Sequence, residues 1–204
     1  MTRIDQPQNR RSHDTRAAIL DATWRLLERR GAADTTMAAV AEEAGVSRRA
    51  VYLHFASRGE LFLALREAVD ERLDLERSLR PISEAADAVQ ALDAWARHVV
   101  SYHSRIASIM RAVDRIRHDD PDAEALWSEA RGRWHEACRG LAARLADEGR
   151  LAPPWTAPAA ADMLCALMSV EFIVELGTER GWGEERLTER LQIVARRALV
   201  VDGG

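Results

Sequence analysis

The sequence predicts an all-α fold, in which three short N-terminal helices form a head and a fourth helix joins this head to a larger C-terminal helical bundle. Two observations lead to this fold class. Along nearly the whole chain, apolar residues recur at the spacing of three and four that places them on one face of a helix. Alternating runs of β-branched residues, which would predict strands, do not occur.

The first predicted helix is "TRAAILDATWRLLERRG", with Thr15 as its N-cap and Gly31 as its stop. Its apolar stripe is Ala18, Ile19, Ala22 and Leu26. The second predicted helix is "MAAVAEEA". Either Thr35 or Thr36 caps it, and it ends at Gly45.

Ser47 caps the third predicted helix, "RRAVYLHF", and Ser57 begins the fourth, "RGELFLALREAVDERLDLERSL", which runs to Pro81. Longer helical patterns follow at roughly 83–104, 105–118, 121–148, 157–180 and 184–200. The prolines of "GRLAPPWTAP" separate the third of these patterns from the fourth, because paired prolines cannot lie inside a helix.

Charge is distributed unevenly along the chain. The net charge is -4, and all 29 basic residues are arginine. Residues 1–60 hold ten arginines against eight acidic residues, whereas the rest of the chain has an excess of acids. A basic head on an acidic body indicates that only the head contacts a polyanion.

The chain lacks the sequence signatures of membrane, secreted, metal-binding and enzymatic proteins. No apolar run is long enough to span a membrane, and residues 1–12 lack the apolar centre of a secretion signal, so we expect a cytoplasmic protein. Cys138 and Cys165 fit reduced core thiols better than a disulfide framework or a zinc knuckle. The histidines form no metal-binding pattern, and no phosphate-binding or nucleophile motif occurs. We therefore expect no metal, no cofactor and no enzymatic activity.

Residues 36–55 have the spacing of a helix-turn-helix. Ala41 is small enough to let two helices cross closely, and Gly45, four residues later, allows the chain to turn with a positive φ. Val40, Val46 and Val51 supply an apolar wedge between the two helices. In this motif the second helix enters the major groove of DNA.

The second helix of this motif has the chemistry that DNA binding needs. It carries no acid, an arginine can pair with a guanine edge, and a small side chain can contact a thymine methyl group. Hydroxyl and imidazole groups can donate to phosphates. The expected DNA contacts are Ser47, Arg48, Arg49, Ala50, Tyr52, His54 and Arg58. The alternative is that the two adjacent arginines belong to an ordinary solvated helix.

Residues 15–65 resemble the DNA-binding domain of the tetracycline-repressor (TetR) family of transcriptional regulators. The resemblance lies in "TRAAILDATWRLLERRG" followed by "TTMAAVAEEAGVSRRAVYLHFASRGELFLAL". The matching positions are Thr36, Ala44, Gly45, Val46, Tyr52, His54, Phe55 and Arg58. The resemblance implies phosphate binding by Thr36, Ser47, Tyr52, His54 and Arg58, and base reading mainly by Arg48, Arg49 and Ala50.

Two positions depart from the family pattern. The family often has lysine where Arg58 stands. It also often has a single basic residue before a small one where Arg48 and Arg49 stand, which leaves open which of the two arginines reads a base.

Three domains follow along the chain. Residues 1–12 are expected to form a disordered basic arm, whose Arg10 and Arg11 either touch phosphate or the minor groove or only add solubility. Residues 13–58 form the helix-turn-helix DNA-binding domain. Residues 59–204 form a domain for ligand binding and dimerisation.

The last two helical patterns each carry a wide apolar stripe, which is either protomer core or one side of a four-helix dimer interface. We favour a homodimer, because one recognition helix covers only a few base pairs. The interface candidates are Leu164, Phe172, Leu187, Leu191 and Val194.

The middle helices carry aromatic and polar residues that form either a packed core or an apolar ligand cavity. The cavity candidates are Trp95, His98, Tyr102, Met110, Trp127, Arg131, Trp134, Met168 and Glu171. The resemblance favours the cavity, because proteins of this family typically release DNA when a small molecule enters the bundle. The expected effector is a small apolar or aromatic compound.

These features together predict a homodimeric transcriptional repressor. It binds a palindromic, double-stranded DNA operator through helix 47–55 and releases it when a ligand binds. One alternative is a small-molecule-binding helical protein with weak DNA binding. Another is a low-specificity DNA-organising protein.

Overall fold

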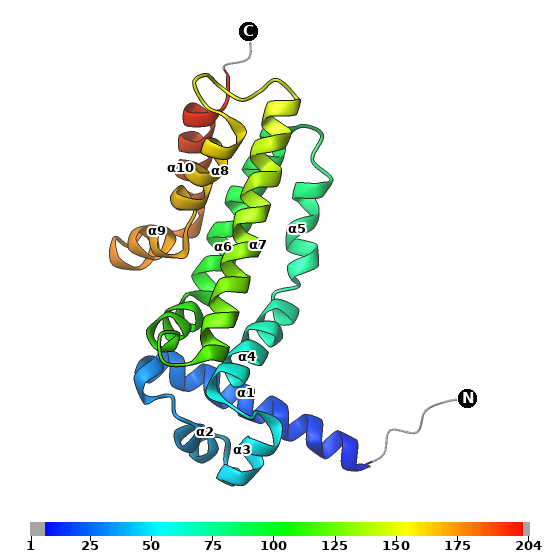
Figure 1. Ribbon diagram of the computed structural model, residues 1–204, viewed down its shortest axis with the longest axis vertical. Helices are drawn as coiled ribbons and strands as arrows, with labels where there is room; N and C mark the ends of the chain where they lie inside the picture. The colour runs from blue at the N-terminus through cyan, green and yellow to red at the C-terminus, as the bar shows by residue number, and fades with distance from the viewer. Residues whose placement is uncertain (1–6, 202–204) are drawn as a thin grey trace, which may run out of the picture. The chain divides into compact units, whose positions relative to one another are not determined.

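The computed structural model describes residues 7–201, and in this part of the chain it confirms the all-α prediction. The elements are helices joined by turns, as Figure 1 shows. One isolated antiparallel bridge joins Leu151 to Val200.

The described helices belong to two compact units. The first unit comprises the residues up to Asp70 together with Ser108–Ser128. The second comprises Glu71–Ala107 together with the residues from Glu129 onward. The functional boundary that the sequence predicts between residues 58 and 59 is a different kind of division and stays a prediction.

The first unit contains α1 (Pro7–Asp34), α2 (Met37–Ala44), α3 (Arg48–His54) and most of α4 (Arg58–Arg72). Within it α1 packs against α2, and α2 packs against α3. Its best buried side chains are Ile19, Ala22, Leu26, Val40, Val51, Phe55, Leu61 and Phe62. Burial of a large apolar side chain stabilises the fold by about 1.5–3 kcal/mol. This packing holds α2 and α3 in place, because helices of that length are not stable alone.

Helix α1 begins earlier than the sequence predicts. Thr15 lies inside the helix, where its Oγ1 donates to the carbonyl of Arg11 at 2.8 Å instead of capping the N-terminus. Residues 7–12 of the predicted arm belong to α1, because each residue added to an existing helix gains a hydrogen bond without a new nucleus. Residues 1–6 of that arm lie outside the described residues. Gly31 interrupts the helix as predicted, with a left-handed φ of 74°.

The second unit contains α5 (Leu75–Ser83), most of α6 (Ala88–Ile116) and α7 (Pro121–Asp147), α8 (Ala157–Leu167), α9 (Val170–Val174), a π-helical turn (Glu175–Glu179) and α10 (Glu184–Leu199). Its core is built mainly by α6, α7, α8 and α10. The largest fully buried side chains in this core are Leu92, Leu145, Leu164, Met168, Ile173 and Leu187. Trp155 in the loop before α8 donates through Nε1 to the carbonyl of Ala198 at 2.7 Å, which ties this loop to α10.

The predicted fourth helix is wrong in its length. It breaks at Asp74, whose backbone is left-handed with a φ of 47°. The Asp74 carboxylate accepts from the backbone N–H of Arg77 at 3.2 Å and so caps a new helix, α5. Aspartate tolerates the left-handed conformation better than most residues, which allows the break at this position. Pro81, the predicted end, lies inside α5.

Two further boundaries differ from the sequence-based expectation. The patterns at 83–104 and 105–118 form one helix, α6, because no proline or glycine interrupts them. The pattern at 157–180 is broken after α8, where Ser169 caps α9 by accepting from the backbone N–H of Phe172 at 3.2 Å. A serine hydroxyl competes with the helical hydrogen bonds at such a position.

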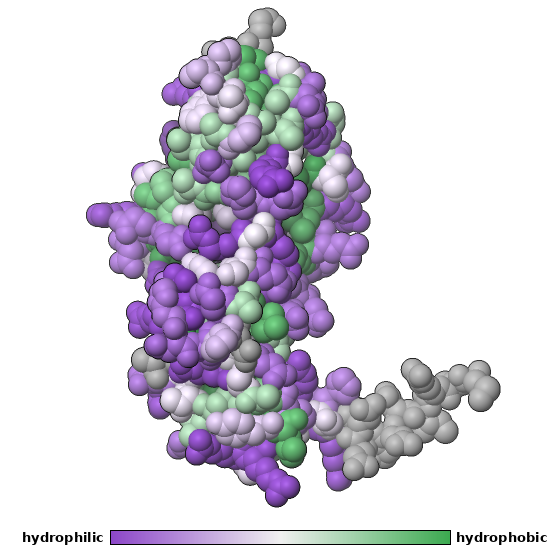
Figure 2. Space-filling view, viewed as in Figure 1, coloured by the Kyte–Doolittle hydropathy of each residue, from purple (hydrophilic) through white to green (hydrophobic). Residues whose placement is uncertain are grey.

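The surface carries few exposed large apolar residues. None of the described helices is long and apolar enough to cross a membrane. The face drawn in Figure 2 is mostly hydrophilic, with smaller hydrophobic areas between the polar ones. In the described part of the chain the exposed large hydrophobic side chains are Tyr52, Leu53, Leu79 and Val194. Two of these four are neighbours on α3.

Candidate nucleic-acid interface

Local capping contacts build the turn between α2 and α3. Thr36, and not Thr35, caps α2, because its Oγ1 accepts from the backbone N–H of Ala39 at 3.1 Å. Gly45 ends α2 in the left-handed conformation, with a φ of 67°. Ser47 caps α3 by accepting from the backbone N–H three residues later at 3.1 Å. The caps predicted for this turn are confirmed, and they set the direction in which α3 leaves it.

Gly45→Ala is expected to lower the free energy of unfolding by about 1–2 kcal/mol, because an L residue is strained in the left-handed conformation. A Cβ at this position would contact nothing, so strain is the whole effect. Gly140→Ala is the matched control: Gly140 lies inside α7, its φ is not left-handed, and a Cβ there also meets open space. Alanine at position 140 should raise the unfolding free energy by about 0.5–1 kcal/mol. Urea unfolding followed by circular dichroism measures both, and shifts of the same sign would contradict the assignment.

Helix α3 turns one face to the core and the other to solvent. Val51 and Phe55 are 0% and 1% exposed, and they hold the helix against the rest of the unit. The predicted DNA contacts lie on the accessible side: Thr36, Ser47, Arg48, Arg49 and Tyr52 are exposed, and Ala50, His54 and Arg58 are partly exposed. All eight therefore lie on the surface of one compact unit, in the helix-turn-helix and the first turn of α4.

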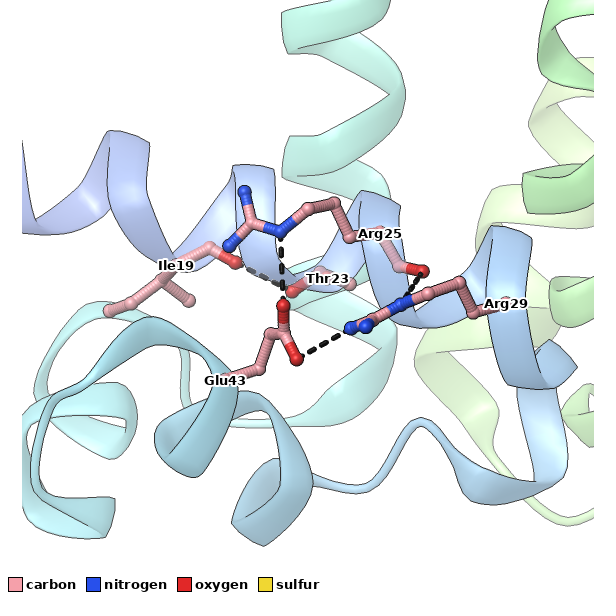
Figure 3. Close-up of polar contacts among 5 residues, drawn as sticks. All are labelled: Ile19, Thr23, Arg25, Arg29 and Glu43. Carbon is pink, nitrogen blue, oxygen red and sulfur yellow. Dashed lines mark hydrogen bonds and ion pairs between the residues drawn. The ribbon is translucent and has the colours of Figure 1, made fainter.

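An ion-pair network joins α1 to α2 beside this turn, as Figure 3 shows. The Glu43 carboxylate accepts from Arg25 Nε at 3.0 Å and from Arg29 Nη2 at 2.6 Å. These two hydrogen bonds lower the pKa of Glu43. Within α1, Thr23 Oγ1 donates to the carbonyl of Ile19 at 2.8 Å. Two arginines of α1 are thus neutralised by an acid of α2.

The arginines of α3, in contrast, keep their charge uncompensated. Among the described residues, no carboxylate forms an ion pair with Arg48 or Arg49. Arg48 lies over the ring of Tyr52, with its guanidinium carbon 5.7 Å from the ring centroid. At the other end of α3, Arg16 of α1 lies 4.6 Å from the ring centroid of Phe55. A cationic helix that is fixed at its end and has no acidic partner suits a polyanion such as DNA.

Two features of this interface are not among the sequence-based predictions. The residues that pair with Glu43 come from another helix, so only the packing of α1 against α2 reveals the network. Leu53 is 76% exposed on α3 although it is a large apolar residue. A signal for Leu53 does exist in the sequence: it follows Arg49 by four residues and therefore lies on the same face of a helix.

Three of the five dimer candidates lie inside the protomer. Leu164, Leu187 and Leu191 are 0%, 1% and 3% exposed and belong to the core of the second unit. They are buried there because α8 and α10 pack against each other within one chain. We therefore reassign these three leucines to the protomer core. Phe172 is partly exposed and Val194 is 45% exposed, so both stay interface candidates.

An aromatic cluster in the second unit contains four of the ligand candidates, Trp95, His98, Tyr102 and Trp134, together with His103. The rings of Trp95 and Trp134 stack with 5.0 Å between their centroids. Those of His98 and Tyr102 stack with 5.3 Å between theirs. His103 lies 4.8 Å from Trp134 and was missed, although it lies two helical turns beyond Trp95 on α6.

Of the remaining ligand candidates, Met168 adjoins this cluster through its backbone, which hydrogen-bonds His103, and the others are dispersed. Met168 is buried in the same core as Trp95. Met110 and Trp127 belong to the first unit. Arg131 and Glu171 are exposed. The dispersal arises because α6 and α7 each contribute residues to both units, so that a shared helix does not imply a shared site.

The two imidazoles of the aromatic cluster are neutral at physiological pH. Burial lowers the pKa of His98 to about 4 and the pKa of His103 to about 3. His98 Nδ1 lies 2.7 Å from Ser78 Oγ. Neither His103 Nδ1 nor Trp95 Nε1 has a hydrogen-bond partner among the described residues. A buried polar atom without a partner costs about 1–3 kcal/mol, so the cluster has unsatisfied hydrogen-bonding capacity.

The two cysteines are free thiols. Cys138 is buried in the core of the second unit, and Cys165 of α8 is partly exposed. Burial raises the pKa of both thiols, which keeps them protonated. Cys138 therefore lies in the core as predicted, whereas Cys165 packs against the edge of that core.

Comparison with known proteins gives a family match in the first unit. A model of the bacterial regulatory proteins of the tetR family matches residues 19–65. The HTH-type transcriptional regulator TtgR of Pseudomonas putida is 42% identical over 81 residues. That match covers 40% of this chain and 37% of TtgR, so the chain spans little more than a third of that relative's length.

The solved structures that resemble the chain over nearly its full length include NalD and FadR. NalD of Pseudomonas aeruginosa, the secondary repressor of the MexAB-OprM multidrug efflux pump, is 27% identical with a TM-score of 0.73, and the match covers 95% of this chain and 99% of NalD. The transcriptional regulator FadR of Bacillus subtilis, solved in complex with stearoyl-CoA, is 15% identical with a TM-score of 0.72. The FadR match covers 89% of this chain and 98% of FadR, and at this identity it shows the fold alone.

Proposed function

Because this chain belongs to the tetR family of bacterial regulatory proteins, we propose that it is a transcriptional repressor that binds a palindromic operator as a homodimer. The observation that carries the proposal is the exposed, acid-free face of α3 beside the capped turn at Gly45. The major groove of DNA accepts a helix presented in this way. Membership of a family of regulators also agrees with the expectation that the chain is not an enzyme.

The exposed residues of the interface divide into two roles. Side chains that read bases are Arg48, Arg49 and Ala50, and those that bind phosphates are Thr36, Ser47, Tyr52, His54 and Arg58. We expect Arg49 to be the main base-reading residue, because it lies almost opposite the buried Val51 on the helix. Arg48 is turned along the helix toward the ring of Tyr52.

Dimerisation uses the surface that α8 and α10 leave exposed. Val194 on α10 is 45% exposed, and Met163 and Leu167 on α8 are partly exposed. These two helices pack against each other, so their outer faces form one surface. Binding to two half-sites of a palindrome requires that the dimer present its two recognition helices about 34–36 Å apart, one turn of DNA.

Val194→Asp is expected to convert the dimer to a monomer and to weaken operator binding strongly. A carboxylate buried in an apolar interface without a partner costs several kcal/mol. Sedimentation velocity measures the mass, and circular dichroism checks that the fold is intact. Leu79→Asp, which changes an exposed leucine of α5, is the matched control and should stay dimeric. A dimeric Val194→Asp protein would show that the interface lies elsewhere.

We assign the effector site to the aromatic cluster around Trp95 and Trp134. The imidazoles there are neutral, and the cluster has an unpaired indole N–H and an unpaired imidazole nitrogen. A ligand that suits this environment has an aromatic or apolar body and one uncharged hydrogen-bonding group. The FadR complex with stearoyl-CoA is an example of a small-molecule complex of this fold. Quenching of tryptophan fluorescence by neutral aromatic compounds tests the assignment.

Ligand binding releases DNA by a shift of population. Helices α4, α6 and α7 each contribute residues to both compact units. A ligand that binds one arrangement of these helices more tightly shifts the protein toward it. DNA is released if, in the arrangement that the ligand favours, the distance between the two recognition helices no longer matches the spacing of the operator half-sites.

Selection of binding sites from a random pool of duplexes tests the proposed function. The expected result is an enriched palindrome. The logarithm of the affinity for it should fall linearly with the logarithm of the salt concentration, with a slope of about 0.9 for each phosphate contact. A shallow slope with equal affinity for random duplex would favour a small-molecule-binding protein with weak DNA binding. A steep slope without any enriched sequence would favour a DNA-organising protein.

A further inference from the structure

We propose that Leu53 reads a thymine methyl group in the major groove, which makes it a specificity-determining residue of α3. The inference rests on the proposed DNA-binding function and adds a residue to the base-reading face. It also names the chemical group that this residue recognises.

The exposure of Leu53 sets it apart from the other apolar residues. Its exposed fraction is 76%, against 44% for Tyr52, 45% for Val194 and 36% for Leu79, the other exposed large hydrophobic residues in the described part of the chain. A leucine that remains in water loses the free energy that burial would supply. It regains that free energy if an apolar group covers it in a complex.

The position of Leu53 on the helix directs it toward the groove. Residues of a helix follow one another at about 100° around its axis. Val51 and Phe55, which are buried, mark the side of α3 that faces the core. Arg49 and Leu53, which are one helical turn apart, lie on the opposite side. They form the outermost line of α3, on the face that is free to enter a major groove.

The chemistry of the side chain selects its target. A leucine has no donor or acceptor, so it cannot bind a phosphate or a polar base edge. The base edges of the major groove present one large apolar group, the C5 methyl of thymine. Arg49 beside it suits a guanine edge, so the outermost line of α3 carries one polar and one apolar reader. We therefore expect a thymine next to the base that Arg49 contacts.

The test is a double-mutant cycle between the protein and the operator. Each thymine of the operator selected from the random pool is replaced by deoxyuridine, which lacks only the methyl group, and affinities are measured for the wild type and for Leu53→Ala. Replacement of the thymine that Leu53 contacts should weaken wild-type binding by about fourfold for each half-site that is changed, which corresponds to about 0.8 kcal/mol for one buried carbon. The same replacement should have no effect on Leu53→Ala.

Two further variants sharpen the test. Leu53→Met keeps an apolar side chain and should keep the sensitivity to deoxyuridine. Leu79→Ala alters an exposed leucine on α5 and should leave the whole deoxyuridine profile unchanged. Because Leu53 is exposed, its replacement is not expected to disturb folding, which a thermal melt verifies.

The outcomes separate this inference from the proposed function. If the wild type and Leu53→Ala lose affinity equally at every deoxyuridine, Leu53 reads no methyl group and the inference is overturned. If Leu53→Ala also binds the operator as tightly as the wild type, Leu53 contributes nothing to operator affinity. If no duplex is enriched from the pool, the proposed function fails, and this inference fails with it.

Discussion

Arg49→Ala is expected to weaken binding to the selected operator by about 5- to 150-fold per half-site, because a bidentate arginine–guanine pair discriminates by about 1–3 kcal/mol. Arg49 lies on the outermost line of α3, and no described carboxylate competes for its guanidinium. Binding to random duplex should weaken much less, because that binding depends on the total charge. Fluorescence anisotropy with the selected operator and with a scrambled duplex measures both affinities at one salt concentration.

The matched control for Arg49→Ala is Arg58→Ala, which also removes one arginine. Arg58 lies at the start of α4 and is assigned to phosphate. Its loss should weaken operator and scrambled duplex alike and reduce the salt slope by about 0.9 for each protomer. If Arg49→Ala behaves in the same uniform way, Arg49 binds the DNA backbone, and Arg48 is the main base-reading arginine.

Acidification is expected to destabilise the protein through the two buried imidazoles of the second unit. Burial lowers the pKa of His98 to about 4 and the pKa of His103 to about 3, whereas in the unfolded chain both have the usual value near 6.5. The unfolded state therefore binds more protons below pH 6.5, and stability falls as the pH falls from 6.5 toward 4. Between pH 6.5 and pH 5 the two histidines together should cost about 3 kcal/mol of unfolding free energy.

Urea unfolding at several pH values measures this loss. His103→Leu replaces the buried imidazole by an apolar side chain of similar size. Below pH 6.5 it should reduce the slope of the unfolding free energy against pH by about 1.4 kcal/mol per pH unit, because one proton fewer is taken up on unfolding. His118→Leu removes an imidazole from an exposed position and serves as the control. The comparison uses the slope of the unfolding free energy against pH, so a change in overall stability does not obscure the result. A His103→Leu profile parallel to that of the wild type would contradict the assignment of the pH dependence to His103.

The helix-turn-helix could be predicted from the amino-acid sequence because its determinants are local. Thr36 and Ser47 cap the two helices through backbone groups three residues away, and Gly45 supplies the left-handed turn between them. Such contacts depend on neighbours in the chain and little on the rest of the fold. The family resemblance, which rests on the same segment, is confirmed for the same reason.

The helices of the second unit were less predictable, because short polar side chains compete with helical hydrogen bonds wherever packing allows it. Asp74 starts a new helix within the pattern predicted to run to Pro81, and Ser169 starts another within the pattern at 157–180. Both residues also occur inside regular helices, so their type alone does not mark a break. The packing around them selects the broken form.

Helical spacing in the sequence was enough to say which residues share a face, and so to find the cationic face of α3. It was not enough to say what each face packs against. The leucine stripes of α8 and α10 suit a core and an interface equally, and folding placed Leu164 and Leu187 in the core. Folding also brought His103 to Trp134 and Glu43 to Arg25, from different helices. Contacts between distant segments depend on how whole helices pack, and periodicity within one helix carries no information about its neighbour.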